Sequence, residues 1–186
     1  MTPYTDNTVT FRMTLAGYRA AVGRFNVGRL SQDVAATFHP LFEALNWAVA
    51  LDDQTRARWS PRGKPLGWGW RDEVSGGDYV RAIRFARNRV HHQWADALEL
   101  TTDGFVLPIT LPLVFHEWRW RRSVDLPAGS STDQAAYDDW LAGHPTRLTL
   151  QQLDETYASV ADLLERPLPP DAKAVQPAPT VDGDLE

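Results

Sequence analysis

Apolar residues recur at helical spacing over several long stretches of the chain, and this periodicity constrains the fold more than any other feature. Across residues 14–53 they fall at three- and four-residue steps, with a break near Ser31, which is suited to cap a second helix. Pro40 lies inside that second stretch and predicts a kink or a restart there. Two further apolar stripes run over about 78–100 and 150–165. We therefore expect these helices to pack around a shared core.

The segment before the last helix has a different pattern. Residues 104–122 break the helical period, contain two prolines, and alternate between apolar and polar residues from Val114 to Arg121. After residue 165 the chain is rich in Pro, Ala and Asp and has little to bury, which predicts a disordered tail over 166–186. The sequence thus predicts a mainly α fold: one helical-bundle domain over 1–165 with a small extended or β-hairpin insertion before the last helix.

Composition excludes several classes of protein. The chain has no cysteine, so disulfides, thiolate catalysis and cysteine-ligated zinc are ruled out. No apolar run reaches the roughly 18–20 residues that a membrane span needs, and the first residues lack the layout of a signal peptide. A net charge of −5 argues against nonspecific coating of nucleic acid, although a local basic groove stays possible. We expect a cytoplasmic protein with no membrane contact.

The strongest chemical signal is the run Arg87-Asn88-Arg89-Val90-His91-His92. RNA carries its own nucleophile, the 2′-hydroxyl beside each phosphodiester. Its cleavage needs a group that transfers protons near neutral pH, which suits histidine, and a cation to stabilise the phosphate, which suits arginine. An amide such as Asn88 can orient the histidine or donate to a phosphate oxygen. This chemistry requires no metal and no other cofactor.

Arg87, Asn88 and His92 together resemble the motif of the HEPN superfamily, which are small helical bundles marked by Arg, often a following polar residue, and His after four to six intervening positions. The resemblance implies a ribonuclease whose homodimer brings two motif copies into one cleft. It also implies a toxin–antitoxin or phage-defence context, with RNA as substrate and an antitoxin or other regulatory protein as a possible partner. In this interpretation Arg87 stabilises the phosphate, Asn88 orients and His92 moves the proton.

Helix geometry adds a condition to that interpretation. At about 100° per residue, Arg87 and His91 lie about 40° apart on a helix, whereas Arg87 and His92 lie about 140° apart. Either the helix is distorted, or the two residues act from different subunits, or His91 is the working histidine. Arg87 also falls at the margin of the apolar stripe, where it needs an interface or an ion pair because burying a lone charge is costly. We expect a dimer seam there.

Other residues are weaker candidates, each with a structural alternative. Arg84 shares a helix face with Asn88 and His92, and the second helix offers polar residues that related domains use for support, or that are ordinary surface residues; the possible supporting set is His91, Arg84, Glu43 and Asn46. Two aromatic and basic segments could stack on and neutralise single-stranded RNA, or could simply anchor the core and a half-buried strand; they contain Arg62, Lys64, Trp68, Trp70, Trp118 and Trp120.

Two rival functions remain open on the sequence alone. One is a catalytically silent HEPN-like module that binds RNA, a nucleotide or a protein, and the other is a helical interaction protein with a Trp-rich surface. A metal site built from His91, His92, His116 and Glu117 has no recognised ligand spacing. A metal-independent endoribonuclease is therefore the predicted function.

Overall fold

The computed structural model describes residues 7–30, 33–58, 69–93, 97–106 and 112–165. The predicted tail over 166–186 and the loop residues Arg62, Lys64 and Trp68 lie outside this part of the chain. The elements in order are α1 (Asn7–Gly28), α2 (Val34–Arg58), α3 (Trp70–Glu73), α4 (Gly77–Gln93), β1 (Leu98–Val106), β2 (Pro112–Trp120), a 3-10 turn η1 (Ser123–Asp125), α5 (Ser131–Trp140) and α6 (Thr146–Glu165).

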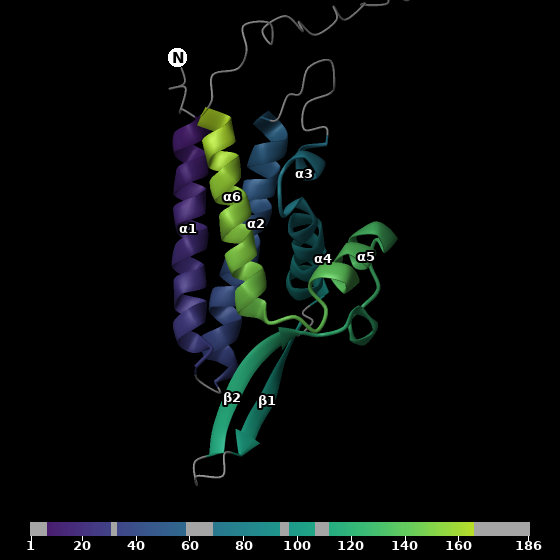
Figure 1. Ribbon diagram of the computed structural model, residues 1–186. Helices are drawn as coiled ribbons and strands as arrows, with labels where there is room; N and C mark the ends of the chain where they lie inside the picture. Colours follow the sequence, from purple (N-terminus) through teal and green to yellow (C-terminus); the bar gives the residue numbers. More distant parts are fainter. Residues whose placement is uncertain (1–6, 31–32, 59–68, 94–96, 107–111, 166–186) are drawn as a thin grey trace, which may run out of the picture.

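The four long helices form a bundle whose neighbours follow one another around a ring. Helix α1 packs on α2 and α6, while α4 packs on α2 and α6 from the other side and also carries α5. Strands β1 and β2 form an antiparallel hairpin that projects from one end of the bundle (Figure 1). This arrangement confirms the mainly α fold with a small hairpin before the last helix.

The predicted apolar stripes form the core of the bundle. Pro40 lies inside α2. The stripe residues that become fully buried are Leu15, Tyr18 and Phe25 of α1, Leu41 and Leu45 of α2, Ile83, Ala86 and Val90 of α4, and Leu150, Leu153, Tyr157 and Val160 of α6. Burial of such side chains on one face of each helix is the main source of stability in a bundle, at about 1.5–3 kcal/mol for each large side chain.

Two glycines allow α4 to begin in close contact with its neighbours. A Cβ on Gly77 would lie 1.8 Å from the carbonyl oxygen of Arg71 in α3. Gly76 has a φ of +84°, and a Cβ there would lie 2.0 Å from Oγ1 of Thr156 in α6. Because only glycine fits these positions, the sequence fixes where α4 starts and how closely it packs.

Several boundaries differ from the sequence prediction. The third helix ends at Gln93 instead of about Leu100, and Leu98 begins strand β1. The two strands therefore cover 98–106 and 112–120, where the sequence predicted an extended insertion over 104–122. Pairing of β1 with β2 overrides the helical period of residues 97–100, because Leu98 lies opposite Trp120 and Leu100 opposite Trp118. Helix α5 was not predicted at all.

Within the described residues, no helix is both long and apolar enough to cross a membrane.

Candidate functional site

The candidate site is the seam where the second half of α4 meets α2. Arg87 is half-buried there, and its Nε donates to Oδ1 of Asn46 on α2 at 3.3 Å. Its Nη1 lies 3.4 Å from Oδ1 of Asn88, the next residue. Asn46 is oriented in turn, because its Nδ2 donates to the carbonyl oxygen of Phe42 at 3.0 Å. The guanidinium of Arg87 is therefore held by amide oxygens in a defined position.

His91 lies in the same seam, one turn beyond Arg87. Its ring stacks on Phe42 with centroids 5.3 Å apart and planes only 9° from parallel. Arg87 contacts Asn46, and His91, one turn later on α4, contacts Phe42, one turn earlier on α2. The two helices therefore run in opposite directions along the seam. This confirms the prediction that Arg87 and His91 share a helix face.

His92 belongs to α4, but its side chain lies outside the described part of the structure. Helix α4 is a continuous α-helix from Gly77 to Gln93. The backbone therefore sets Arg87 and His92 about 140° apart around the axis. The structure brings together Arg87, Asn88, Asn46 and His91.

Arg84 lies three residues before Arg87 on α4 and contacts carboxylates of α2. It forms ion pairs with Asp52 and with Asp53 of α2, the latter at 3.1 Å. Burial lowers the pKa of Arg84, but the two carboxylates more than offset that effect, so the pKa lies above its ordinary value. Asp52 is fully buried and also pairs with Arg71 at 2.5 Å. Arg84 thus joins α4 to α2 as part of a structural ion-pair network.

Glu43 faces α1 and not the motif. Its Oε2 accepts from Nη2 of Arg24 at 2.5 Å, and its Oε1 accepts from Nε1 of Trp47 at 3.3 Å. The hydrogen bond from Arg24 is the main reason that the pKa of Glu43 is lowered. Of the two supporting residues predicted on α2, Asn46 contacts Arg87 and Glu43 contacts Arg24.

An apolar depression on α2 borders the seam, and sequence reasoning missed it. It has a volume of about 320 Å³ and is lined by Phe42, Glu43, Asn46, Trp47 and Ala50. Phe42 and Trp47 are half-buried, and Phe38 stacks on Phe42 with centroids 6.1 Å apart. The available signal was the width of the apolar stripe on α2, which is broader than one buried face requires.

Three of the four tryptophans proposed for RNA stacking lie in the interior, and the fourth, Trp68, is outside the described residues. Trp70, Trp118 and Trp120 are exposed by only 2%, 5% and 0%. Nε1 of Trp120 donates to Oγ1 of Thr149 at 3.0 Å, which joins β2 to α6. Because their rings are covered, these three side chains offer no free face on which a base could stack, and their placement agrees with the alternative that they anchor the core.

Among the described residues, no three His, Asp or Glu side chains gather closely enough to hold a metal ion. Comparison of the chain with protein-family models, with curated proteins and with solved structures found no significant match. The fold and site thus define a mainly helical bundle with an arginine–amide–histidine seam between two of its helices.

Proposed function

We propose that this chain is a metal-independent endoribonuclease of HEPN type. The observation that carries the proposal is the α2–α4 seam, in which Asn46 orients Arg87 while His91 lies one turn further along α4. A fixed guanidinium can stabilise the charge that develops on a phosphate, and a histidine can transfer a proton near neutral pH. The motif resemblance of Arg87, Asn88 and His92 supports the same chemistry.

The reaction consists of one displacement at phosphorus. A base removes the proton of the 2′-hydroxyl, whose oxygen then bonds to the adjacent phosphorus. The bond from phosphorus to the 5′-oxygen breaks, and that oxygen receives a proton from an acid. The products are a 2′,3′-cyclic phosphate and a free 5′-hydroxyl. Arg87 stabilises the pentavalent phosphate, Asn88 orients, and His92 carries the proton, with His91 as the alternative proton carrier.

The proposal includes a homodimer and a toxin–antitoxin or phage-defence role. Arg87 and His92 diverge around one regular helix, so a cleft shared by two protomers would let them act on the same phosphate. Such a cleft would also hold two histidines, one to take a proton and one to give it. The half-buried aromatic face of α2 beside the motif supplies apolar surface suited to this contact.

The proposal is tested with the full chain, end-labelled RNA and EDTA. Cleavage should continue in EDTA, yield a 2′,3′-cyclic phosphate, and depend on a group that titrates between about pH 5 and 8. Arg87→Ala should lower kcat far more than RNA affinity, because its role is in the transition state. His92→Ala should lower kcat by about 10²–10⁴, and His91→Ala should have a smaller effect.

Arg81→Gln is the matched control. It removes an arginine from the same helix, but Arg81 pairs with Asp72 and Asp78 and lies outside the seam. It should leave kcat within about twofold. Cleavage that stops in EDTA and returns with magnesium would refute the metal-independent mechanism. RNA binding without cleavage would select the catalytically silent module, and a larger loss in His91→Ala than in His92→Ala would assign proton transfer to His91.

A further inference from the structure

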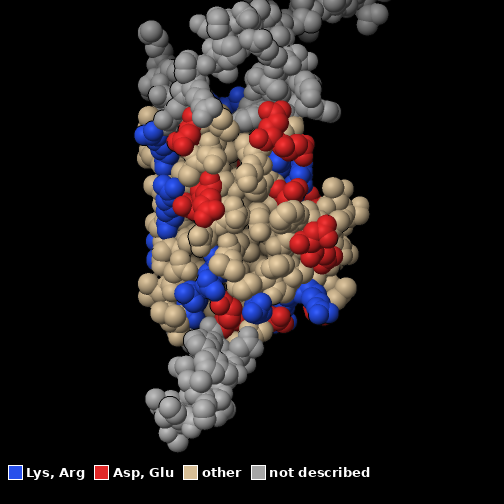
Figure 2. Space-filling model, in the orientation of Figure 1, with Lys and Arg blue, Asp and Glu red and all other residues tan. Residues whose placement is uncertain are grey.

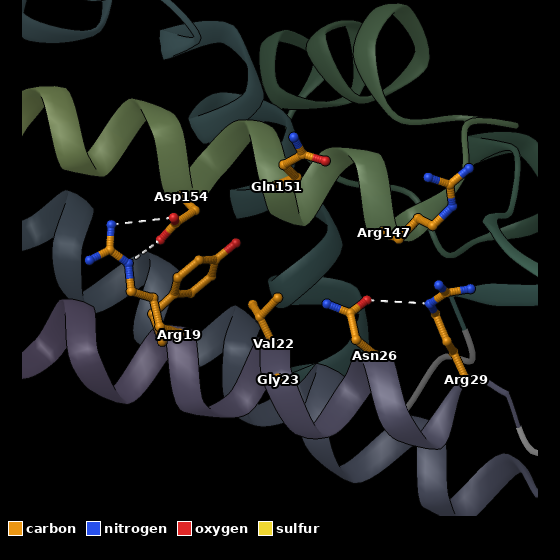
Figure 3. Close-up of a pocket in the computed structure, with 9 residues that line it drawn as sticks. Arg19, Val22, Gly23, Asn26, Arg29, Arg147, Gln151 and Asp154 are labelled. Atoms are coloured by element: carbon orange, nitrogen blue, oxygen red, sulfur yellow. Dashed lines mark hydrogen bonds and ion pairs between the residues drawn. The ribbon is translucent and has the colours of Figure 1, made fainter.

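A polar groove runs between α1 and α6. Its volume of about 450 Å³ falls in the range of about 300–1,000 Å³ that is typical of small-molecule sites. Figure 3 shows side chains from both helices facing one another across it. The groove is lined by Tyr18, Arg19, Val22, Gly23, Asn26 and Arg29 of α1 and the adjoining turn, and by Arg147, Gln151 and Asp154 of α6.

This groove lies on the opposite edge of the bundle from the Arg87 seam. The four long helices contact one another in the ring order α1, α2, α4, α6. The seam of Arg87 is the α2–α4 edge, and the groove is the α6–α1 edge. A ligand in the groove therefore occupies a second site, separate from the proposed ribonuclease site.

One end of the groove concentrates positive charge. Arg29 and Arg147 face each other there across the gap, with Asn26 beside Arg29 (Figure 3). Arg29 donates to Oδ1 of Asn26 at 3.3 Å, and no carboxylate among the residues that the structure describes forms an ion pair with it. Arg147 forms an ion pair with Glu117, in which Nε of Arg147 lies 3.1 Å from Oε2 of Glu117. Figure 2 shows basic side chains along α1 and near the lower end of α6 on this face.

The other end is neutral in sum. Nε of Arg19 lies 2.6 Å from Oδ1 of Asp154, which closes that end with a paired charge. The lining holds three arginines and one carboxylate; Asp154 offsets Arg19 and the adjacent Glu117 offsets Arg147, so the excess positive charge is that of Arg29. An anion is attracted to the Arg29–Arg147 end, whereas a long run of phosphates would meet the carboxylate of Asp154.

The middle of the groove is open and carries groups that recognise hydroxyls. A Cβ on Gly23 would have no heavy atom within 4 Å, so the wall there is set back. Asn26 and Gln151 line it with amides, which can both donate and accept hydrogen bonds; Oδ1 of Asn26 accepts from Arg29, and Nε2 of Gln151 donates to Oε1 of Glu155 at 3.1 Å. The floor is rigid, because the hydroxyl of the buried Tyr18 donates to the carbonyl oxygen of Leu150 at 2.7 Å.

We propose that the α1–α6 groove binds a small phosphate ester that also carries hydroxyl groups. Arg29 and Arg147 hold the phosphate, since guanidinium groups match phosphate oxygens with paired hydrogen bonds. Asn26 and Gln151 bind the hydroxyls along the middle. The Asp154 end limits the ligand to a single phosphate group, which favours a sugar phosphate or the sugar–phosphate part of a nucleotide over an RNA strand.

The probe for this proposal is ribose 5-phosphate, measured by calorimetry with the full chain. It should bind, whereas ribose alone should bind at least about tenfold more weakly because it lacks the phosphate. Arg29→Gln should weaken binding by about tenfold or more, and Gly23→Leu should abolish it by filling the open wall. Gly23→Leu should keep the native circular dichroism spectrum, because the added side chain meets open space.

Arg24→Gln is the control, since Arg24 is an arginine of α1 that pairs with Glu43 outside the groove. It should leave binding within about twofold. Adenosine 5′-monophosphate distinguishes the two kinds of phosphate ester. If it binds more tightly than ribose 5-phosphate, the ligand is a nucleotide. If it binds equally or more weakly, the ligand is a sugar phosphate.

Two results would overturn the proposal. One is failure of ribose 5-phosphate to bind the wild-type chain at millimolar concentration, or its unchanged binding to Gly23→Leu. The other is an RNA oligonucleotide that loses affinity in Arg29→Gln and Gly23→Leu while ribose 5-phosphate does not bind, which would make the groove part of an RNA path. Neither result depends on RNA cleavage, so the groove and the ribonuclease proposals fail separately.

Discussion

At the scale of single residues, the position of Arg87 depends on a relay of hydrogen bonds. The carbonyl oxygen of Phe42 accepts from Asn46, which directs the Asn46 oxygen toward Arg87. Asn46 is thus a positioning residue in the proposed mechanism. Its neighbour Glu43 is directed toward Arg24 on α1. The two side chains lie three positions apart on α2. Removing Asn46 should therefore affect RNA cleavage, whereas removing Glu43 should not.

Asn46→Ala should lower kcat for RNA cleavage by about tenfold, because a misplaced cation loses part of its stabilisation of the transition state. KM should stay within about twofold, and the free energy of unfolding should fall by only about 1 kcal/mol, the cost of one hydrogen bond. Steady-state kinetics and urea denaturation measure both. Glu43→Ala should leave kcat within about twofold. Equal losses in the two variants would show that the Asn46–Arg87 contact has no special role.

The sequence identified the residues of the seam better than it identified their partners. The helical repeat was sufficient to place Arg87 and His91 on one face, and the resemblance to related helical domains suggested Asn46 and Glu43 as candidate supports. It could not show that Glu43 turns to α1, because that depends on where Arg24 lies in the folded bundle. Nor could it separate covered from exposed aromatics: Trp70 was a candidate for RNA stacking, and it is buried.

At the scale of elements, one buried carboxylate joins three helices. Asp52 of α2 is fully buried and pairs with Arg71 of α3 and with Arg84 of α4. Both arginines are mostly covered, with side chains exposed by 17% and 26%. Removing one member of such a group leaves the remaining charges buried without compensation. Asp53, which also pairs with Arg84, has a side chain exposed by 55%.

Asp52→Asn should therefore lower the free energy of unfolding by about 3–5 kcal/mol. Asp53→Asn should lower it by no more than about 1 kcal/mol, because an exposed ion pair is weakened by water and salt. Urea denaturation followed by circular dichroism measures the difference between these neighbours. Similar small effects from both substitutions would mean that Arg71 and Arg84 are well solvated and that the network is not structural.

Helix α5 was not predicted from the sequence, and strand β1 begins earlier than the sequence predicted. Helix α5 buries few side chains, chiefly Tyr137, so it carries no extended apolar stripe. Strand β1 begins with Leu98, and the apolar positions before it still follow the helical period of α4. Its extended form depends on the pairing with β2, a contact across the loop that local sequence does not encode. The long helices, whose stripes span several turns, were predicted as helices, although several of their ends were misplaced.

At the scale of the whole molecule, three buried tyrosines connect elements that are distant in sequence. Each hydroxyl donates to a backbone carbonyl oxygen at 2.7 Å: Tyr18 of α1 to Leu150 of α6, Tyr157 of α6 to Ala48 of α2, and Tyr137 of α5 to Arg121 after β2. Burial is the main reason that the pKa of each is raised in the folded protein. The folded state thus favours the neutral phenol at all three positions.

Alkaline pH should unfold the protein through these side chains. A group whose pKa is raised on folding contributes stability that is complete below its unfolded pKa of about 10 and is lost as pH rises above it. Tyrosinate absorbance from Tyr18, Tyr137 and Tyr157 should therefore appear together with the loss of helical circular dichroism. In Tyr157→Phe the rise in tyrosinate absorbance that accompanies unfolding should be smaller. Complete tyrosinate formation in a chain that keeps its native spectrum would contradict the prediction.

A cleft shared by two protomers requires that the chain form a dimer. Phe38 and Phe42 stack beside the apolar depression of α2, next to the seam of Arg87, and both remain half-buried in one protomer. Covering such a face removes apolar surface from water, which favours a second copy in the same position. The proposed mechanism needs that copy, because one regular helix turns Arg87 and His92 apart.

The chain should therefore sediment as a dimer at micromolar concentration. Phe38→Glu should produce a monomer by burying a charge at the interface, with unchanged helical content and a loss of cleavage that parallels the loss of dimer. Val124→Glu is the control, since that apolar side chain is exposed by 82% in η1, outside the α2–α4 seam. It should leave a dimer. A wild-type chain that sediments as a monomer yet cleaves RNA at a rate proportional to its concentration would show that the site is complete in one protomer. Proton transfer would then fall to His91, which already lies beside Arg87 on the same face of α4.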